Sequence, residues 1–158
     1  SLERGLILLF DYGLPRAHYY HPQRTRGTLR CHYKQLAHDN ALINVGVQDI
    51  TAWVDFTRVA EAADASGLQV SGFATQAAFL LGLGIDSLVA GQGVADNESE
   101  DLKSGAPPDA RAQARRASEA RQLLMPGEMG EVFKAIALTR ELEAPLSGFS
   151  LQDLRHSL

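Results

Sequence analysis

The chain begins with an uninterrupted apolar run that is typical of a strand covered on both faces. Leu6 to Phe10 are five consecutive apolar residues, and Asp11 and Gly13 end the run. Such runs occur in parallel sheets, which carry helices on both faces. From Leu14 to Val47 the chain has no regular apolar period and contains many proline, glycine, histidine and arginine residues. A connection of this length is usually functional or irregular.

Residues 49–75 change from a strand pattern to a helix pattern and back. Residues 49–56 alternate between apolar and polar, which predicts a half-buried strand or an extended entry to a helix. Residues 57–66 are rich in alanine and end before Gly67, which suits a left-handed helix cap. Residues 68–75 predict another short strand. This order predicts an α/β sheet with right-handed crossovers.

The second half of the chain predicts helices followed by one last strand. A helix is expected over residues 75–85, an acidic segment over 96–101 and a basic helix over 111–124, with oppositely charged arms that attract each other. A turn at residues 125–130 precedes a strand at 132–140, and residues 148–158 are expected to form a tail.

Composition and charge exclude several classes of protein. The 158 residues suffice for one domain with a core, and a net charge of −4 leaves no electrostatic footprint for nucleic acid or an anionic membrane. Cys31 is the single cysteine, which rules out an internal disulfide and favours a reducing compartment. The longest apolar stretch, residues 73–85, is too short to span a bilayer. With no secretory signal in the sequence, we expect a cytoplasmic protein that binds neither membrane nor nucleic acid.

Three aspartates are candidates for chemistry. Asp11 would lie at the carboxyl end of a strand, where α/β sheets bind ligands, although it could simply begin a turn that Gly13 completes. Asp49 and Asp55 would share one face of a strand and could act as acid and base or hold a cation. For Asp55, its place before a helix favours an N-cap instead.

Residues 18–38 contain imidazoles and guanidinium groups without a recognisable motif. His18 and His21 have the spacing of a helical metal pair, but Tyr-Tyr and then Pro22 argue against a helix there. Together with Cys31, His32 and His38 they form a weak zinc signal, so no metal site is predicted. Arg24, Arg26 and Arg30 could clamp an anion or a carboxylate, although such arginines are more often solvated or salt-bridged.

Several ordered strings resemble one enzyme family. They are DYG at 11–13, YYHPQRTRGTLRCHYKQLAHD at 19–39, QDITAWVDF at 48–56, GFATQAAFLLGLGI at 72–85 and MPGEMGEVFKAIAL at 125–138. In this combination the chain resembles the C-terminal half of the MidA-like S-adenosylmethionine-dependent methyltransferases. The mitochondrial members of that family are protein-arginine methyltransferases needed for respiratory complex I assembly.

The resemblance implies a fold and also implies which part of the parent enzyme binds the cofactor. It implies that residues 1–158 are the C-terminal part of a Rossmann-like class I methyltransferase sheet, with the fifth strand ending at DYG, the sixth at residues 68–75 and an antiparallel seventh at 132–140. Residues 75–128 would be a helical insertion. The first four strands and the cofactor-binding residues would be missing, so S-adenosylmethionine would bind the parent enzyme and not this chain alone. An unpaired strand edge would then favour a homo-oligomer.

The resemblance also implies candidate site residues. The parent would transfer a methyl group to protein arginine, with Asp11, Asp49 and Asp55 as the acidic catalytic candidates. Tyr12, Thr28, Arg30, Thr51 and Gln76 would line the substrate side. The expected partner is a protein substrate such as a respiratory complex I subunit or its bacterial equivalent. The alternative is a non-catalytic interaction module that docks a partner through Arg111, Arg115 and Arg116.

Overall fold

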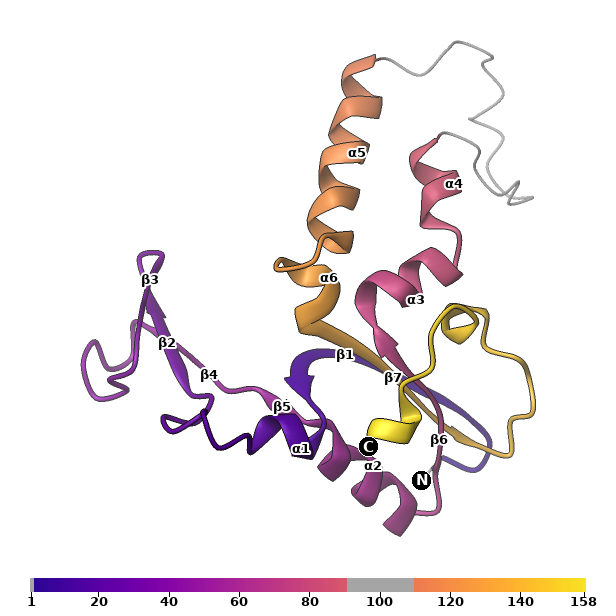
Figure 1. Cartoon of the computed structure of the whole chain (residues 1–158), viewed down its shortest axis with the longest axis horizontal. Helices are drawn as coiled ribbons and strands as arrows, with labels where there is room; N and C mark the ends of the chain where they lie inside the picture. The colour runs from indigo at the N-terminus through magenta and orange to yellow at the C-terminus, as the bar shows by residue number, and fades with distance from the viewer. Residues whose placement is uncertain (1, 91–109) are drawn as a thin grey trace.

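The computed structural model describes residues 2–90 and 110–158, so the predicted acidic segment at 96–101 lies outside the described residues. Figure 1 shows a central sheet, an arm that extends from it, and a group of helices that extends in another direction. The arm, residues 20–53, contains a small sheet of its own.

The main sheet has four strands in the order β5-β1-β7-β6. They are β1 (Gly5–Leu14), β5 (Val54–Asp55), β6 (Gln69–Thr75) and β7 (Phe133–Arg140). β7 is antiparallel to both β1 and β6, whereas β1 and β5 are parallel over only two residue pairs. The fold is therefore mixed α/β with parallel and antiparallel pairs.

Alternate residues of β7 face two different apolar clusters. On one face Ile136 and Leu138 pack with Phe73 and with Phe56 of α2 (Phe56–Ala65). On the other face Ala135 and Ala137 pack with Phe79 of α3 (Gln76–Gly82) and with η2 (Ser147–Phe149). The strand period of two thus buries β7 on both sides, and its six inner residues are all buried.

The remaining helices are short except for one. α1 (Arg16–Tyr19) follows β1, and α4 (Ile85–Val89), α5 (Ala110–Leu124) and α6 (Met129–Val132) lie between α3 and β7 in the chain. η3 (Arg155–Ser157) belongs to the C-terminal segment, where Leu154 and Leu158 pack against the cluster around Phe56. The predicted tail is irregular, but it is part of the packed structure.

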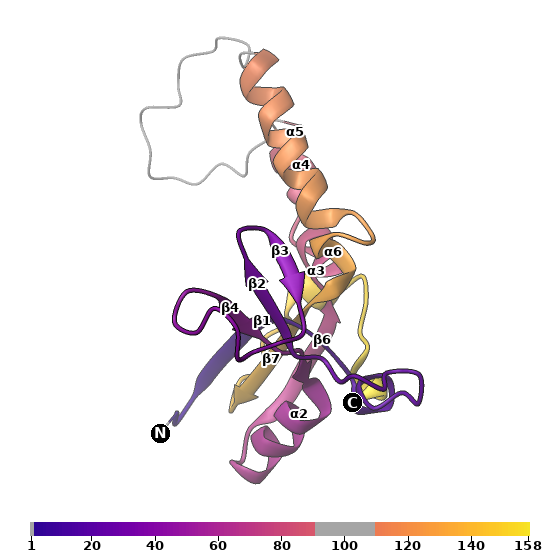
Figure 2. The ribbon, with the colours of Figure 1, turned by 90° about the vertical axis from the view of Figure 1, so that its left-hand side faces the viewer.

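The arm carries a three-stranded antiparallel sheet that the sequence pattern did not predict. β2 (Arg30–Tyr33) pairs with β3 (Leu36–His38) on one side and β4 (Asp49–Thr51) on the other. Lys34 and Gln35 connect β2 and β3 with φ values of 48° and 66°, as a two-residue hairpin of the primed type requires. Figure 2, a view from the side of the arm, shows this hairpin in front of the main sheet.

Four local predictions need correction. Residues 6–10 are 36–42% exposed instead of covered on both faces, because α2 and α3 pack over β6 and β7 and leave β1 at the margin. Residues 49–56 form two short strands in different sheets, of which only β5 is the extended entry to α2. α1 is a helix of one turn despite Tyr19 and Tyr20, although it ends before His21. The predicted turn at residues 125–130 also ends early, because α6 begins at Met129.

Candidate functional site

A row of polar residues crosses the main sheet where β1 and β6 end. Asp11 of β1 lies opposite Lys134 of β7, and Lys134 lies opposite Thr75 of β6. Residues directly opposite each other on neighbouring strands project to the same face of a sheet. The structure thus brings a carboxylate, an ammonium and a hydroxyl group to one face of the sheet near the start of β7.

Lys134 is the member of this row that the sequence analysis missed. Its side chain is buried, and Nζ donates to the backbone carbonyls of Glu131 and Val132. Burial lowers the pKa of Lys134, while the charge of Glu131 opposes that shift. A single lysine among the apolar residues of β7 was the available signal in the sequence.

Asp11 and Tyr12 are held by local contacts at the end of β1. Asp11 Oδ1 accepts a hydrogen bond of 2.8 Å from the backbone N–H of Tyr12. The Tyr12 ring packs edge-on against Phe133, with 5.5 Å between the ring centroids. Asp11 itself is half-buried.

Asp55 connects the start of α2 to α1. Its Oδ1 accepts from the backbone N–H of Arg58, and its Oδ2 accepts from Arg16 Nε at 3.3 Å. The N-cap predicted for Asp55 is therefore confirmed. Arg16 also donates to both carboxylate oxygens of Glu61, at 2.6 and 2.7 Å. Hydrogen bonding to Arg16, with a smaller contribution from Arg58, lowers the pKa of Glu61 to about 2.

The arm holds four of the predicted site residues. Asp49 lies opposite His32 and is exposed, whereas Thr51 lies opposite Arg30 and bonds to its carbonyl at 3.5 Å. Arg30 forms an ion pair with Asp39. The remaining member, Thr28, bonds through Oγ1 to the Tyr19 hydroxyl and to the Trp53 backbone N–H. Because Asp49 and Asp55 belong to different strands of different sheets, the prediction that they share one strand face is wrong.

Gln76 has a structural contact of its own. It is buried, and its Nε2 donates to the Leu123 carbonyl at 3.1 Å, which links α3 to α5. Its neighbour Thr75 caps α3 through the Ala78 N–H and bonds to Gln152 of the C-terminal segment at 2.8 and 3.0 Å. A role for Gln76 in substrate binding stays a prediction.

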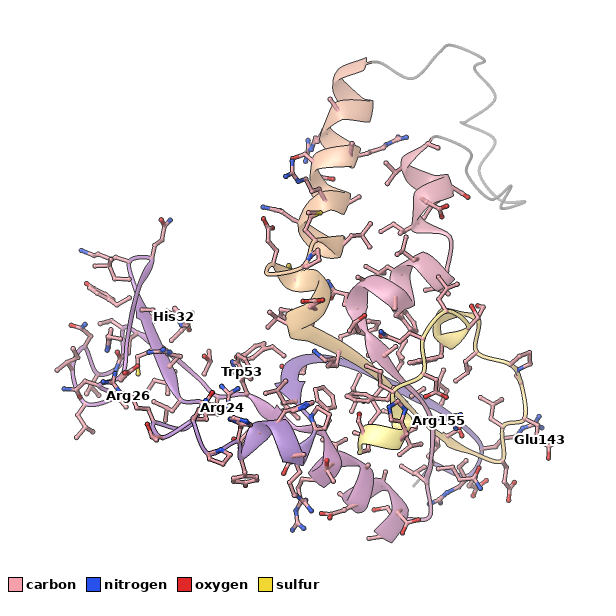
Figure 3. All side chains as sticks on the ribbon, viewed as in Figure 1. Arg24, Arg26, His32, Trp53, Glu143 and Arg155 are labelled. Carbon is pink, nitrogen blue, oxygen red and sulfur yellow. The ribbon has the colours of Figure 1, made fainter. Side chains whose placement is uncertain are left out.

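A pocket of about 670 Å³ lies between the end of β1, α1 and the arm. Its lining consists of Leu14, His18, His21, Gln23, Arg24, Thr25, Arg26, Gly27 and Arg30. Leu14 follows Asp11 by three residues along β1, which corresponds to roughly 10 Å. Figure 3 labels Arg24, Arg26 and Trp53 in this part of the molecule.

Within residues 2–90 and 110–158, no three histidine, cysteine or acidic side chains come together in a way that could hold a metal ion. In the same ranges no helix combines the length and the apolarity that crossing a bilayer demands.

Comparison with known proteins identifies the kind of protein that this chain resembles. Residues 1–74 match the protein family described as "Putative S-adenosyl-L-methionine-dependent methyltransferase". Every predicted site residue except Gln76 lies inside that match. A search of curated proteins found no match.

Two solved structures from Burkholderia thailandensis are similar to nearly the whole chain. One is an uncharacterized protein of the COG1565 superfamily, and the other is a "COG1565 superfamily member and likely methyl transferase" bound to S-adenosyl-homocysteine. Each is 37% identical over 98% of this chain, with a TM-score of 0.85. The chain spans 38% and 37% of the length of these two proteins.

Proposed function

We propose that this chain is part of an S-adenosylmethionine-dependent methyltransferase and that it contributes the methyl-acceptor side of the active site. The observation that carries the proposal is the 37% identity, over 98% of the chain, to a structure that holds S-adenosyl-homocysteine. That ligand is the product left when S-adenosylmethionine has lost its methyl group. The fold and the family match support the same class of reaction.

The proposal includes an assignment of the strands. β1, β6 and β7 would be the fifth, sixth and seventh strands of a class I methyltransferase sheet, and residues 75–128 a helical insertion between the last two. The strand order β1-β7-β6 with an antiparallel β7 is consistent with this assignment. The cofactor would then bind to a part of the parent protein outside residues 1–158. Titration calorimetry with S-adenosyl-homocysteine tests this: we expect binding to the full-length protein and none to residues 1–158.

The acceptor in this proposal is a protein arginine. A guanidinium nitrogen would attack the methyl carbon, the sulfur–methyl bond would break, and the proton lost from nitrogen would pass to a carboxylate. Asp11 and Asp49 are the better candidates for that carboxylate. Asp55 uses both oxygens to hold Arg58 and Arg16 and is only 14% exposed.

The experiment is a methyl-transfer assay on the full-length protein with radiolabelled S-adenosylmethionine and peptides that contain either arginine or lysine. We expect methylarginine as the product and a loss of at least about 100-fold in kcat for Asp49→Asn or Asp11→Asn, which is the contribution typical of a general base. Asp64→Asn, on the exposed side of α2, is the matched control. Transfer to lysine only, or full activity in both variants, would contradict this assignment.

A second candidate function is a non-catalytic interaction module. The observation in its favour is the basic surface of α5, where Arg115 and Arg116 are exposed and Arg115 is paired with Glu119 at 2.8 Å. The side chain of Arg111 lies outside the described residues. Under this alternative, charge reversal at residues 111, 115 and 116 would abolish capture of the partner while Asp49→Asn would change nothing.

A further inference from the structure

The pocket between α1 and the arm is strongly basic. Its lining includes three arginines and two histidines, and none of its lining residues is acidic. This contrasts with the whole chain, whose net charge is −4. Positive charge therefore gathers in this pocket although the chain as a whole is acidic.

Arg24 is held in place but has an unused donor. Its guanidinium carbon lies 4.8 Å from the centre of the Trp53 ring, and the Trp53 backbone N–H donates to Thr28 Oγ1 at 3.2 Å. Stacking on an indole fixes the plane of a guanidinium and leaves the N–H groups at its edge available. Among the described residues, Nε of Arg24 is buried and has no hydrogen-bond partner. A buried donor without a partner is costly, and a small turn of the Arg24 side chain would bring it to an acceptor in the pocket that Arg24 lines.

The other two arginines are only partly neutralised. Arg26 and Arg30 share one carboxylate, that of Asp39, with the Arg26 contact at 3.3 Å. Arg24 forms no ion pair among the described residues, so the three guanidinium groups have one paired carboxylate between them and an excess of two positive charges. Arg26 and Arg30 are both exposed, so their side chains can turn toward a ligand.

His21 adds a directed donor to the same pocket. Its Nδ1 accepts a hydrogen bond of 3.3 Å from the backbone N–H of Gln23. A neutral imidazole that accepts at Nδ1 carries its proton on Nε2. The free nitrogen of His21 is therefore a donor, like every arginine around it.

From this geometry we infer that the pocket binds the phosphate group of a phosphorylated ligand. A phosphate monoester is a dianion that matches the excess of two positive charges, whereas a carboxylate would neutralise only one. The planar forks of the arginines can each donate two hydrogen bonds to phosphate oxygens. The same charges would repel a guanidinium, so the inference does not depend on methyl transfer to arginine, and it assigns Arg30 to the phosphate instead of to that acceptor.

The test is a titration of isotopically labelled residues 1–158 with inorganic phosphate at about pH 8, where the dianion dominates. Two-dimensional NMR follows the backbone amides and the arginine Nε–H groups at constant ionic strength. We expect saturable shifts confined to the pocket residues, the largest at Arg24 Nε–H. Arg24→Ala and Arg30→Ala should each weaken binding by about tenfold or more, as expected when a charge-assisted hydrogen bond is lost.

Controls separate this site from general charge attraction. Arg121→Ala removes the same charge from an exposed position on α5 and should leave the affinity unchanged. Loss of dispersion in the spectrum of Arg24→Ala would mean that this variant is unfolded. In that case Arg24→Lys is used instead, because it keeps the charge without the planar fork and should still bind phosphate more weakly than the wild type. Tighter binding of O-phosphoserine than of inorganic phosphate would support a phosphorylated side chain as the source, and equal binding would support a free phosphate. Unsaturable shifts, equal binding of acetate, or full affinity in Arg24→Ala would overturn the inference.

Discussion

Among single residues, Asp55 has a structural role in the fold and is also a candidate catalytic carboxylate. It caps α2 and holds Arg16, yet it lies in a string shared with a methyltransferase family. Loss of an aspartate N-cap destabilises a protein by about 1 kcal/mol, and asparagine is an equivalent cap. We expect Asp55→Ala to lower the free energy of unfolding by about that amount and Asp55→Asn to lower it by less. Urea unfolding of residues 1–158 measures both. A methyl-transfer defect in Asp55→Asn without loss of stability would instead make Asp55 catalytic.

Glu61 provides a prediction about pH. Its pKa is lowered from 4.5 to about 2 in the folded chain by the hydrogen bonds from Arg16, supported by Arg58. A carboxylate with a lowered pKa stabilises the fold above its unfolded pKa, and that contribution is lost as the pH falls from about 4.5 toward 2. Because Glu61 is 45% exposed, solvent screens the effect. We expect the melting temperatures of the wild type and Glu61→Gln to differ near neutral pH and to converge as the pH falls below about 3. A constant difference would mean that Arg16 and Glu61 are not paired in solution.

Among elements, the β2–β3 hairpin shows why the small sheet of the arm could not be predicted from the sequence. Its strands are four and three residues long, and its turn residues, Lys34 and Gln35, adopt positive φ without the Asn-Gly signal that usually marks such a turn. We expect Lys34→Asn combined with Gln35→Gly to stabilise the hairpin, because those residues adopt positive φ at little cost. Hydrogen exchange of the β2 and β3 amides should slow relative to the wild type, while exchange in β6 and β7 should not change. Faster exchange in the arm would mean that the turn is of another type.

The elements that the sequence predicted are those whose ends and apolar patterns depend on residues close together in the chain. α2 begins after a capping aspartate and ends before Gly67 at a φ of 74°, and the mainly apolar β7 is buried on both faces. The apolar run alone does not reveal which neighbours cover β1, whereas the missing first four strands that the resemblance implies did predict its unpaired edge. The buried position of Lys134 and the bond between Gln152 and Thr75 depend on contacts between segments far apart in the sequence. For the same reason Asp49 and Asp55 appeared to share a face, although two separate strands carry them.

For the whole molecule, the free side of β1 determines how residues 1–158 should behave in solution. Within the described residues, positions 5–12 pair with β7 on one side only, since β5 reaches just Gly13 and Leu14. The apolar side chains at positions 6–10 are more than a third exposed. An exposed, regular, apolar edge strand is a template for pairing with another chain. A two-fold axis between two copies would place one β1 antiparallel to the other and would bury both edges at once.

We therefore expect purified residues 1–158 to form a dimer or a larger assembly whose mass depends on concentration. Leu8→Lys, in the middle of β1, should shift the chain toward the monomer, because a charged residue on an edge strand opposes strand pairing. Leu88→Lys is the control, since Leu88 lies on α4, is 53% exposed and is not part of the main sheet. Size-exclusion chromatography with light scattering measures the mass, and circular dichroism checks that both variants remain folded. A wild type that is monomeric at every concentration would refute the prediction. Dissociation by Leu88→Lys but not by Leu8→Lys would assign the interface to the helices, because only a contact through α4 would then be broken.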